Sequence, residues 1–278
     1  MNFINCSNTV KPIEISEAIA FWSQNSFEHI KTLFNFTKGT TAKLNENFVK
    51  ELENLYTDFK TVNEIYKQNS GKIPQQSAFF FKTNKRFIDL LERIKYEAVS
   101  GYPVLQQTVF HYLYEQRYIN AVFGMINPRS NVLISTEFSP FSNNLRSCIY
   151  NQIYFWSIIG SIHPSSLMES NAFYNSINAY SREYLTKITN GFNQINFSLS
   201  SIKKSPQKHA LESIFEDFCT LNKTILDFLL ATRQGSPKIF VSSDNIHLPL
   251  SFYEKLQHMI NEHTLVEKLN ENIKKRLL

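Results

Sequence analysis

Glycine, proline and cysteine are scarce in this sequence. Its 278 residues include 7 Gly, 9 Pro and 3 Cys, and the first two fall well below the average usage of about 7% and 5%. Few turn-forming residues and long amphipathic stretches predict an all-α protein with a large core, to which 24 Phe and 13 Tyr contribute. Three distant cysteines without C-x-x-C spacing argue against a disulfide framework and against cysteine-ligated zinc, and they favour a reducing cytoplasm.

The sequence also lacks the usual signals of a membrane protein or a nucleic-acid-binding protein. No run of 18 or more apolar residues predicts a transmembrane helix, and no basic segment followed by an apolar stretch indicates a signal peptide. The net charge is +5, but the basic residues are scattered and form no patch interleaved with aromatics. We therefore expect a cytoplasmic protein that binds neither nucleic acid nor a membrane.

Eight helices are predicted, in two groups of four. Apolar residues at spacings of three and four indicate helices over 17–38, 41–69, 76–99, 103–126, 142–162, 169–197, 207–232 and 250–275. Short connections within each group are typical of antiparallel four-helix bundles. Residues 127–141 break the helical pattern with two prolines, so we predict two domains, 1–134 and 135–278.

The two groups of helices share a sequence pattern. Matching residues are separated by 134 positions early in each group, by 141 in the middle and by 147 near the end. The pairs are Phe21/Phe155, Trp22/Trp156, His29/His163, Thr83/Thr224, Phe87/Phe228, His111/His258 and Glu115/Glu262. An offset that grows in order is what loop insertions between equivalent helices produce, and it predicts an internal repeat.

Carboxylates and histidines at helical spacing are the candidate metal ligands. In the first predicted helix, Glu17, Phe21 and Glu28 lie within about 40° of one another around the axis. A carboxylate on a core stripe must be paired, protonated or bound to a metal. His29 follows Glu28 directly, so both side chains could reach the interior of the same bundle.

Two H-x-x-x-E pairs strengthen this hypothesis. His111 and Glu115 lie one helical turn apart, and so do His258 and Glu262. A single such pair is common on a solvated helix, but recurrence in both halves favours a ligand role. Nitrogen and oxygen ligands converging in a bundle suit iron, manganese or zinc. The remaining histidines are predicted at the surface: His209, His247 and His263.

These motifs resemble an uncharacterised bacterial family built as two ferritin-like four-helix bundles in tandem, with E-x-x-x-FW…EH opening each half and H-x-x-x-E in each fourth helix. The resemblance implies two tandem antiparallel ferritin-like bundles and metal binding, without a reaction or substrate. The first half matches fully. The second departs, with Asn151 in place of Glu17, Ile162 in place of Glu28, and Pro164 after His163. Two carboxylates are lost, and proline ends or kinks a helix. We therefore expect a degraded second site that binds metal more weakly than the first, or not at all.

The sequence thus predicts a divalent-metal protein, with iron first and manganese or zinc as alternatives. The expected ligands are Glu17, Glu28, His29, His111, Glu115, His163, His258 and Glu262. Glu17 would be an outer ligand or an acceptor for the N–H of a ligand histidine. Bound iron could support oxygen or peroxide chemistry, and whether the protein is an enzyme stays open. The alternatives are a non-catalytic helical scaffold, perhaps as a homodimer, and metal sequestration without turnover.

Overall fold

The structure is a computed structural model that describes residues 12–39, 44–68, 74–97, 102–124, 145–202, 208–241 and 248–277. Within these ranges it is helical, with one isolated antiparallel bridge between Ile177 and Phe240. The chain divides into two compact units, Met1–Phe141 and Ser142–Leu278, called unit 1 and unit 2 below. The predicted boundary after residue 134 falls in 125–144, which lies outside the described residues.

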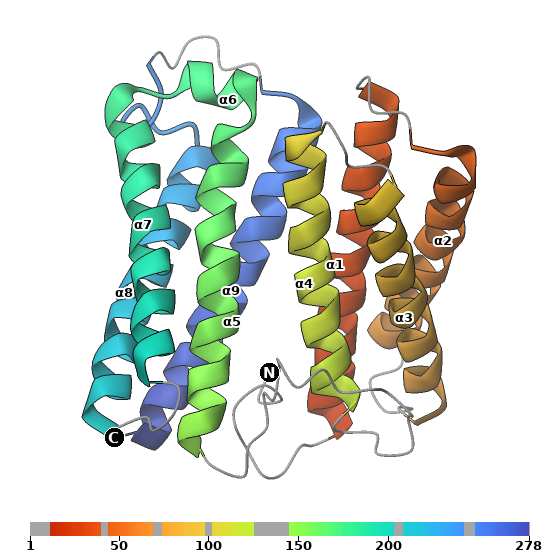
Figure 1. The fold of residues 1–278 in the computed structure, drawn as a ribbon, viewed down its shortest axis with the longest axis horizontal. Helices are drawn as coiled ribbons and strands as arrows, with labels where there is room; N and C mark the ends of the chain where they lie inside the picture. Colours follow the sequence, from red (N-terminus) through yellow and green to blue (C-terminus); the bar gives the residue numbers. More distant parts are fainter. Residues whose placement is uncertain are drawn as a thin grey trace. The chain divides into compact units, whose positions relative to one another are not determined.

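The described residues of unit 1 form four long helices that pack on one another in sequence order (Figure 1). They are α1 (Pro12–Gly39), α2 (Glu46–Gln68), α3 (Pro74–Glu97) and α4 (Pro103–Gly124). The first helix also contacts the third and the fourth, so the four share one core. Its largest fully buried side chains include Trp22, Phe59, Phe80, Phe87 and Tyr118.

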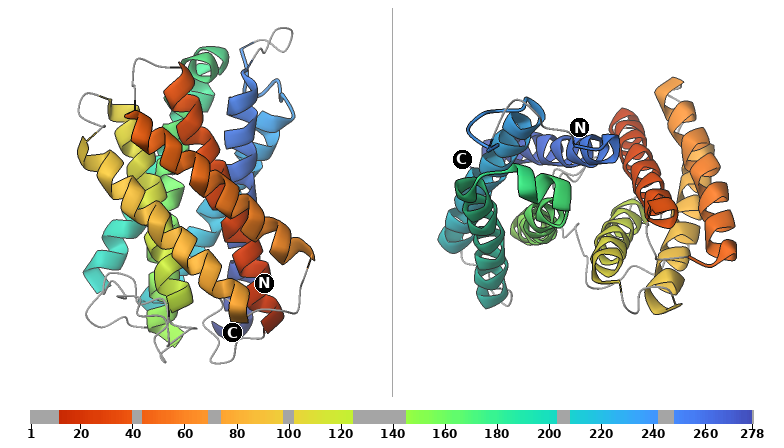
Figure 2. Two further views of the ribbon diagram at one scale, coloured as in Figure 1. Left: turned by 90° about the vertical axis from the view of Figure 1, so that its right-hand side faces the viewer. Right: turned by 90° about the horizontal axis from the view of Figure 1, so that it is seen from above.

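In unit 2, the part of the chain that the structure describes forms four long helices and one short one. They are α5 (Leu145–Met168), α6 (Asn171–Ser176), α7 (Ala179–Ile202), α8 (Lys208–Arg233) and α9 (Leu250–Leu277). Within this unit α5 packs against α7, α8 and α9, and α8 packs against both α7 and α9 (Figure 2). The repeated residues of the two halves lie on the first, third and fourth long helices of their units.

The predicted helix over 169–197 is two helices in the structure. Ser170 caps α6, since its side chain accepts a hydrogen bond from the Phe173 N–H, and Ile177 is extended. The Asn178 side chain then accepts from the Ser181 N–H at 2.8 Å and starts α7. Capping side chains stabilise helix starts, so two caps within one apolar run divide it where periodicity alone predicts continuity.

Helix α5 passes through Pro164 and ends at Met168, so the prediction that it ends at Ile162 is wrong. Proline removes a helical N–H and crowds the carbonyl four residues earlier, here that of Gly160. Burial favours continuation, because His163 and Leu167 are fully buried. Tertiary packing outweighs the local penalty, and His163 stays on the inward face of α5.

Two findings concern the expected compartment. None of the described helices has both the length and the apolar character needed to cross a membrane. Cys148 is disulfide-bonded, a bond that the sequence did not lead us to expect, whereas Cys219 is a free, buried thiol. Cys6 lies outside the described residues.

Candidate metal centre

Helices α1 and α4 of unit 1 bring His29, His111 and Glu115 together, and all three side chains are buried. The Glu115 carboxylate is fully buried; its Oε2 lies 3.2 Å from His29 Nε2, and its Oε1 contacts His111 Nε2. The two histidines are 1% and 5% exposed. Each carboxylate oxygen therefore faces a different imidazole. These three residues are called the unit 1 group.

Neighbouring side chains hold the His29 ring in place. Tyr112 stacks on it, with ring centroids 3.7 Å apart and planes 17° apart. On its other nitrogen, Gln116 Nε2 lies 3.3 Å from His29 Nδ1. Asn84 donates to the Gln116 backbone oxygen at 3.1 Å and so ties α3 to α4 at this point. The ring is therefore fixed by stacking on one face and by an amide at its edge.

Helices α5 and α9 build the same arrangement in unit 2. His163 Nε2 lies 3.1 Å from Glu262 Oε2, and His258 Nε2 lies 3.5 Å from Glu262 Oε1. His163 is fully buried, and Glu262 and His258 are 1% and 7% exposed. These residues are called the unit 2 group. His163 therefore stays in contact with Glu262 although Pro164 follows it directly in the sequence.

His263 is buried beside the unit 2 group, so its prediction as a surface residue is also wrong. Its Nε2 lies 2.9 Å from His163 Nδ1, and its Nδ1 lies 2.7 Å from Asn222 Oδ1. Burial lowers the pKa of His263 to about 3. The signal in the sequence is its stripe, since Met259 and Val266 flank it at helical spacing and are buried. His209 is exposed as predicted, and His247 lies outside the described residues.

The structure does not bury Glu17 and Glu28 with the unit 1 group. Glu17 is exposed, and Glu28 is half-buried and accepts a hydrogen bond from Gln24 at 2.8 Å. The buried stripe of α1 includes Trp22, Ser26 and His29, which at 100° per residue lie roughly 120–180° around the axis from Glu17. The stripe containing Phe21 is therefore not the core stripe of α1, and the expectation that it points both carboxylates inward is wrong.

The donor atoms are of the kinds that divalent transition metals prefer. Each group offers two imidazole nitrogens and one carboxylate, a set suited to iron, manganese or zinc. In each unit, the donor atoms of the carboxylate and of a neighbouring histidine lie within 4.8 Å of each other. Comparison with known protein families, curated proteins and solved structures gave no match. The resemblance to tandem ferritin-like proteins therefore stays a prediction.

Proposed function

We propose that this protein binds divalent metal ions through the unit 1 group and the unit 2 group, on a fold of two tandem ferritin-like four-helix bundles. One observation supports the proposal most directly. In each unit a fully buried carboxylate lies between two buried imidazoles, with one oxygen turned to each ring. A carboxylate so deeply buried requires a positive partner or a proton.

A bound metal ion can balance the charge of the buried carboxylate without a buried imidazolium. Two histidines and a glutamate in one buried place would need a buried imidazolium to balance the carboxylate, and burying charged groups is costly unless they are well paired. A divalent ion is attracted to all three donors at once. The same solution occurs in both units, on the first and last long helix of each.

The donor set also limits the choice of metal. Neither group includes a thiolate, which disfavours copper(I) and iron–sulfur clusters, and imidazole with carboxylate suits iron, manganese and zinc. We take iron first. Three protein ligands leave a coordination position for water or substrate, as in catalytic zinc sites, and a bound metal would supply Lewis-acid or redox chemistry there. The protein's own part is to bind and orient the ion and to exclude water.

Metal content of the purified protein tests the proposal. Protein produced in medium supplemented with iron, manganese and zinc is expected to carry stoichiometric metal. His111→Ala and Glu262→Gln should each lose most of the metal from the affected group while circular dichroism stays helical. His209→Ala is the matched control, because its side chain is 98% exposed, and it should keep full metal content.

The alternative function is that of a helical scaffold that binds no metal. It is favoured by the continuity of the polar network in unit 1, where Ser26 and Asn84 both hydrogen-bond to Gln116. If this is the whole role of the groups, the purified protein contains no stoichiometric metal. Added Fe²⁺, Mn²⁺ or Zn²⁺ would then release no binding heat, and His111→Ala would change only stability. That result would contradict the metal proposal.

A further inference from the structure

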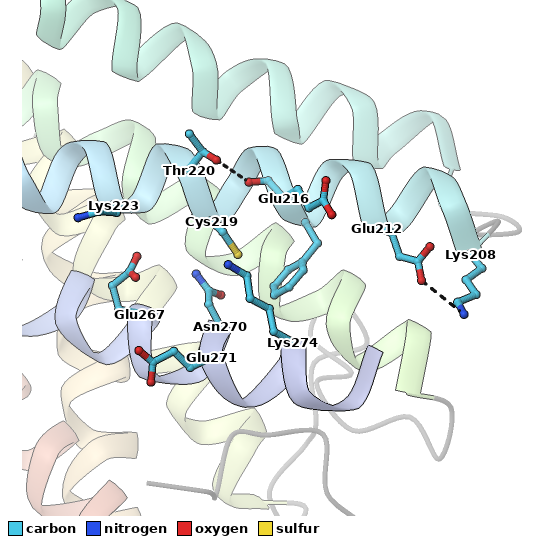
Figure 3. Close-up of a pocket in the computed structure, with 11 residues that line it drawn as sticks. Lys208, Glu212, Glu216, Cys219, Thr220, Lys223, Glu267, Asn270, Glu271 and Lys274 are labelled. Carbon is cyan, nitrogen blue, oxygen red and sulfur yellow. Dashed lines mark hydrogen bonds and ion pairs between the residues drawn. The ribbon is translucent and has the colours of Figure 1, made fainter. Parts of the chain in front are cut away.

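The amide of Asn222 has only one orientation that satisfies its neighbours. Its Nδ2 lies 3.2 Å from the His263 backbone oxygen and 2.6 Å from Glu267 Oε1. Both neighbours are acceptors, so the NH₂ end must face them. The amide oxygen of Asn222 must therefore face His263. Glu267 also lines a cavity of about 730 Å³ between α8 and α9 (Figure 3).

This orientation decides which nitrogen of His263 carries the hydrogen. Asn222 Oδ1 can only accept, so His263 Nδ1, 2.7 Å away, must donate to it. His263 is 2% exposed, and its ring nitrogens contact an amide oxygen and an imidazole. A second ring proton would make a buried cation without a carboxylate in contact, which is costly. The ring is therefore neutral, with a lone pair on Nε2.

The hydrogen position on His263 also decides which ring nitrogen of His163 carries a hydrogen. Because His263 Nε2 is an acceptor, His163 Nδ1 must donate across the 2.9 Å contact. His163 Nε2 is thereby turned to Glu262 Oε2, 3.1 Å away. Metal-bound histidines characteristically donate their second ring N–H to a fixed acceptor, which sets the ring orientation and raises ligand basicity. His263 is placed to be that acceptor.

We propose that His263 and Asn222 are positioning residues of the unit 2 group, which hold His163 with its hydrogen on Nδ1 and offer Nε2 to a divalent ion. The inference deepens the proposed metal function and rests on it for the identity of the ligand. It also compensates for the departures of the second half from the sequence signature. The positioning pair reaches His163 from α8 and α9, and it requires neither of the two motif glutamates that Asn151 and Ile162 replace.

In the unit 1 group, the contact that is described at the second ring nitrogen of His29 is to an amide that can turn round. Gln116 places Nε2 3.3 Å from His29 Nδ1 and Oε1 2.9 Å from Ser26 Oγ. Ser26 Oγ is also 2.9 Å from the Trp22 backbone oxygen, and one hydroxyl hydrogen serves only one of these acceptors. Turning the Gln116 amide round would satisfy the Ser26 contacts equally well and would make His29 Nδ1 a donor. Either tautomer of His29 is therefore compatible with its Gln116 contact, whereas His263 and Asn222 together allow only one tautomer of His163.

Imidazole ¹⁵N NMR of the full chain tests the hydrogen order directly. Long-range ¹H–¹⁵N spectra are recorded for the metal-free and the Zn²⁺-loaded protein, and the His163 signals are assigned by their loss in His163→Gln. We expect a protonated Nδ1 on His163 and on His263 in both samples. A His163 ring with hydrogen on Nε2 alone would overturn the proposal, and this test needs no variant of the positioning residues.

Zn²⁺ affinity, measured by competition with a chelator, tests the consequence. His263→Gln can still present an acceptor to His163, and we expect its affinity for Zn²⁺ to stay within about threefold of the original protein. His263→Leu and Asn222→Leu should weaken binding by about 10–100-fold, while His209→Leu, the exposed control, should not. Either variant suffices if the other does not fold.

The outcomes separate the two proposals. Normal Zn²⁺ binding in both leucine variants would overturn the positioning role and leave the metal function intact. Absence of Zn²⁺, Fe²⁺ and Mn²⁺ binding in the original protein would overturn the metal function, even with hydrogen on His163 Nδ1. Weakened binding in His263→Leu together with normal binding in His263→Gln supports both.

Discussion

Lys255 belongs to α9, and its half-buried amine lies at the C-terminal end of α5. Its Nζ donates to the Ser166 backbone oxygen at 2.9 Å, one of the last-turn carbonyls that a helix leaves without an internal partner. Burial lowers the pKa of Lys255 to about 8, although the charge of Glu169 acts in the opposite direction. The amine thus supports the end of the helix that carries His163.

The lowered pKa predicts a pH dependence of stability. Between about pH 8 and 10.5 the unfolded chain holds a proton on Lys255 that the folded protein has released, so the free energy of unfolding gains a contribution that rises with pH. Measured against Lys255→Met, the original protein should gain up to about 3 kcal/mol across this interval. Urea unfolding of both proteins from pH 7 to 10.5 measures it, and a constant difference would contradict it.

At the residue scale, the sequence predicted the histidines and glutamates of both groups better than their surroundings. His111, Glu115, His258 and Glu262 are predicted as ligands because helical spacing places each pair on one face. The structure buries all four, and their role as ligands stays a prediction. Glu17 and Glu28 were misplaced because two apolar stripes run along α1. His263 was missed although Met259 and Val266 place it on an apolar stripe, because its polar partner Asn222 comes from another helix, α8.

At the element scale, Gly160 lets two helices of unit 2 approach closely. A Cβ at this position would lie 2.5 Å from the Phe192 ring, which is too close for carbon atoms in contact. Phe192 in turn lies against His263, with ring centroids 6.5 Å apart. The glycine therefore determines how the aromatic ring of α7 packs beside the positioning pair.

Gly160→Ala is expected to destabilise the protein despite the better helix propensity of alanine. Overpacking a core costs roughly 1–3 kcal/mol, which exceeds the gain of roughly 1 kcal/mol that alanine brings in a helix. Thermal or urea unfolding measures the net loss. Gly160→Ala combined with Phe192→Leu should recover part of the stability, and equal stability of the single variant and the original protein would refute the close approach.

The all-α class and the long helices were predictable because apolar periodicity extends over many turns. The ends of the helices were less so. Pro164 is a strong local stop signal, yet the buried residues after it keep α5 helical to Met168. The division of the predicted helix over 169–197 depends on two capping contacts, which periodicity does not report.

At the scale of the whole molecule, metal binding should raise stability by mass action. An ion that binds only the folded protein adds about 2.7 kcal/mol when its free concentration is 100 times the dissociation constant. Calorimetric melting of the protein with and without Zn²⁺ measures this effect. We expect a higher melting temperature with Zn²⁺, a smaller rise in Glu262→Gln, and no rise in a double variant that also carries Glu115→Gln.

The residues of the unit 1 group and of the unit 2 group lie on the first and the last long helix of their unit. This placement has a consequence for the synthesis of the protein. His29 leaves the ribosome well before His111, and His163 well before His258. A nascent chain therefore holds isolated histidines, which bind metal weakly, until its closing helix has emerged and docked. If the two groups bind metal as we propose, an ion can be fully coordinated only after the last long helix of the unit has been made. A chain truncated before α9 would lack a complete unit 2 group.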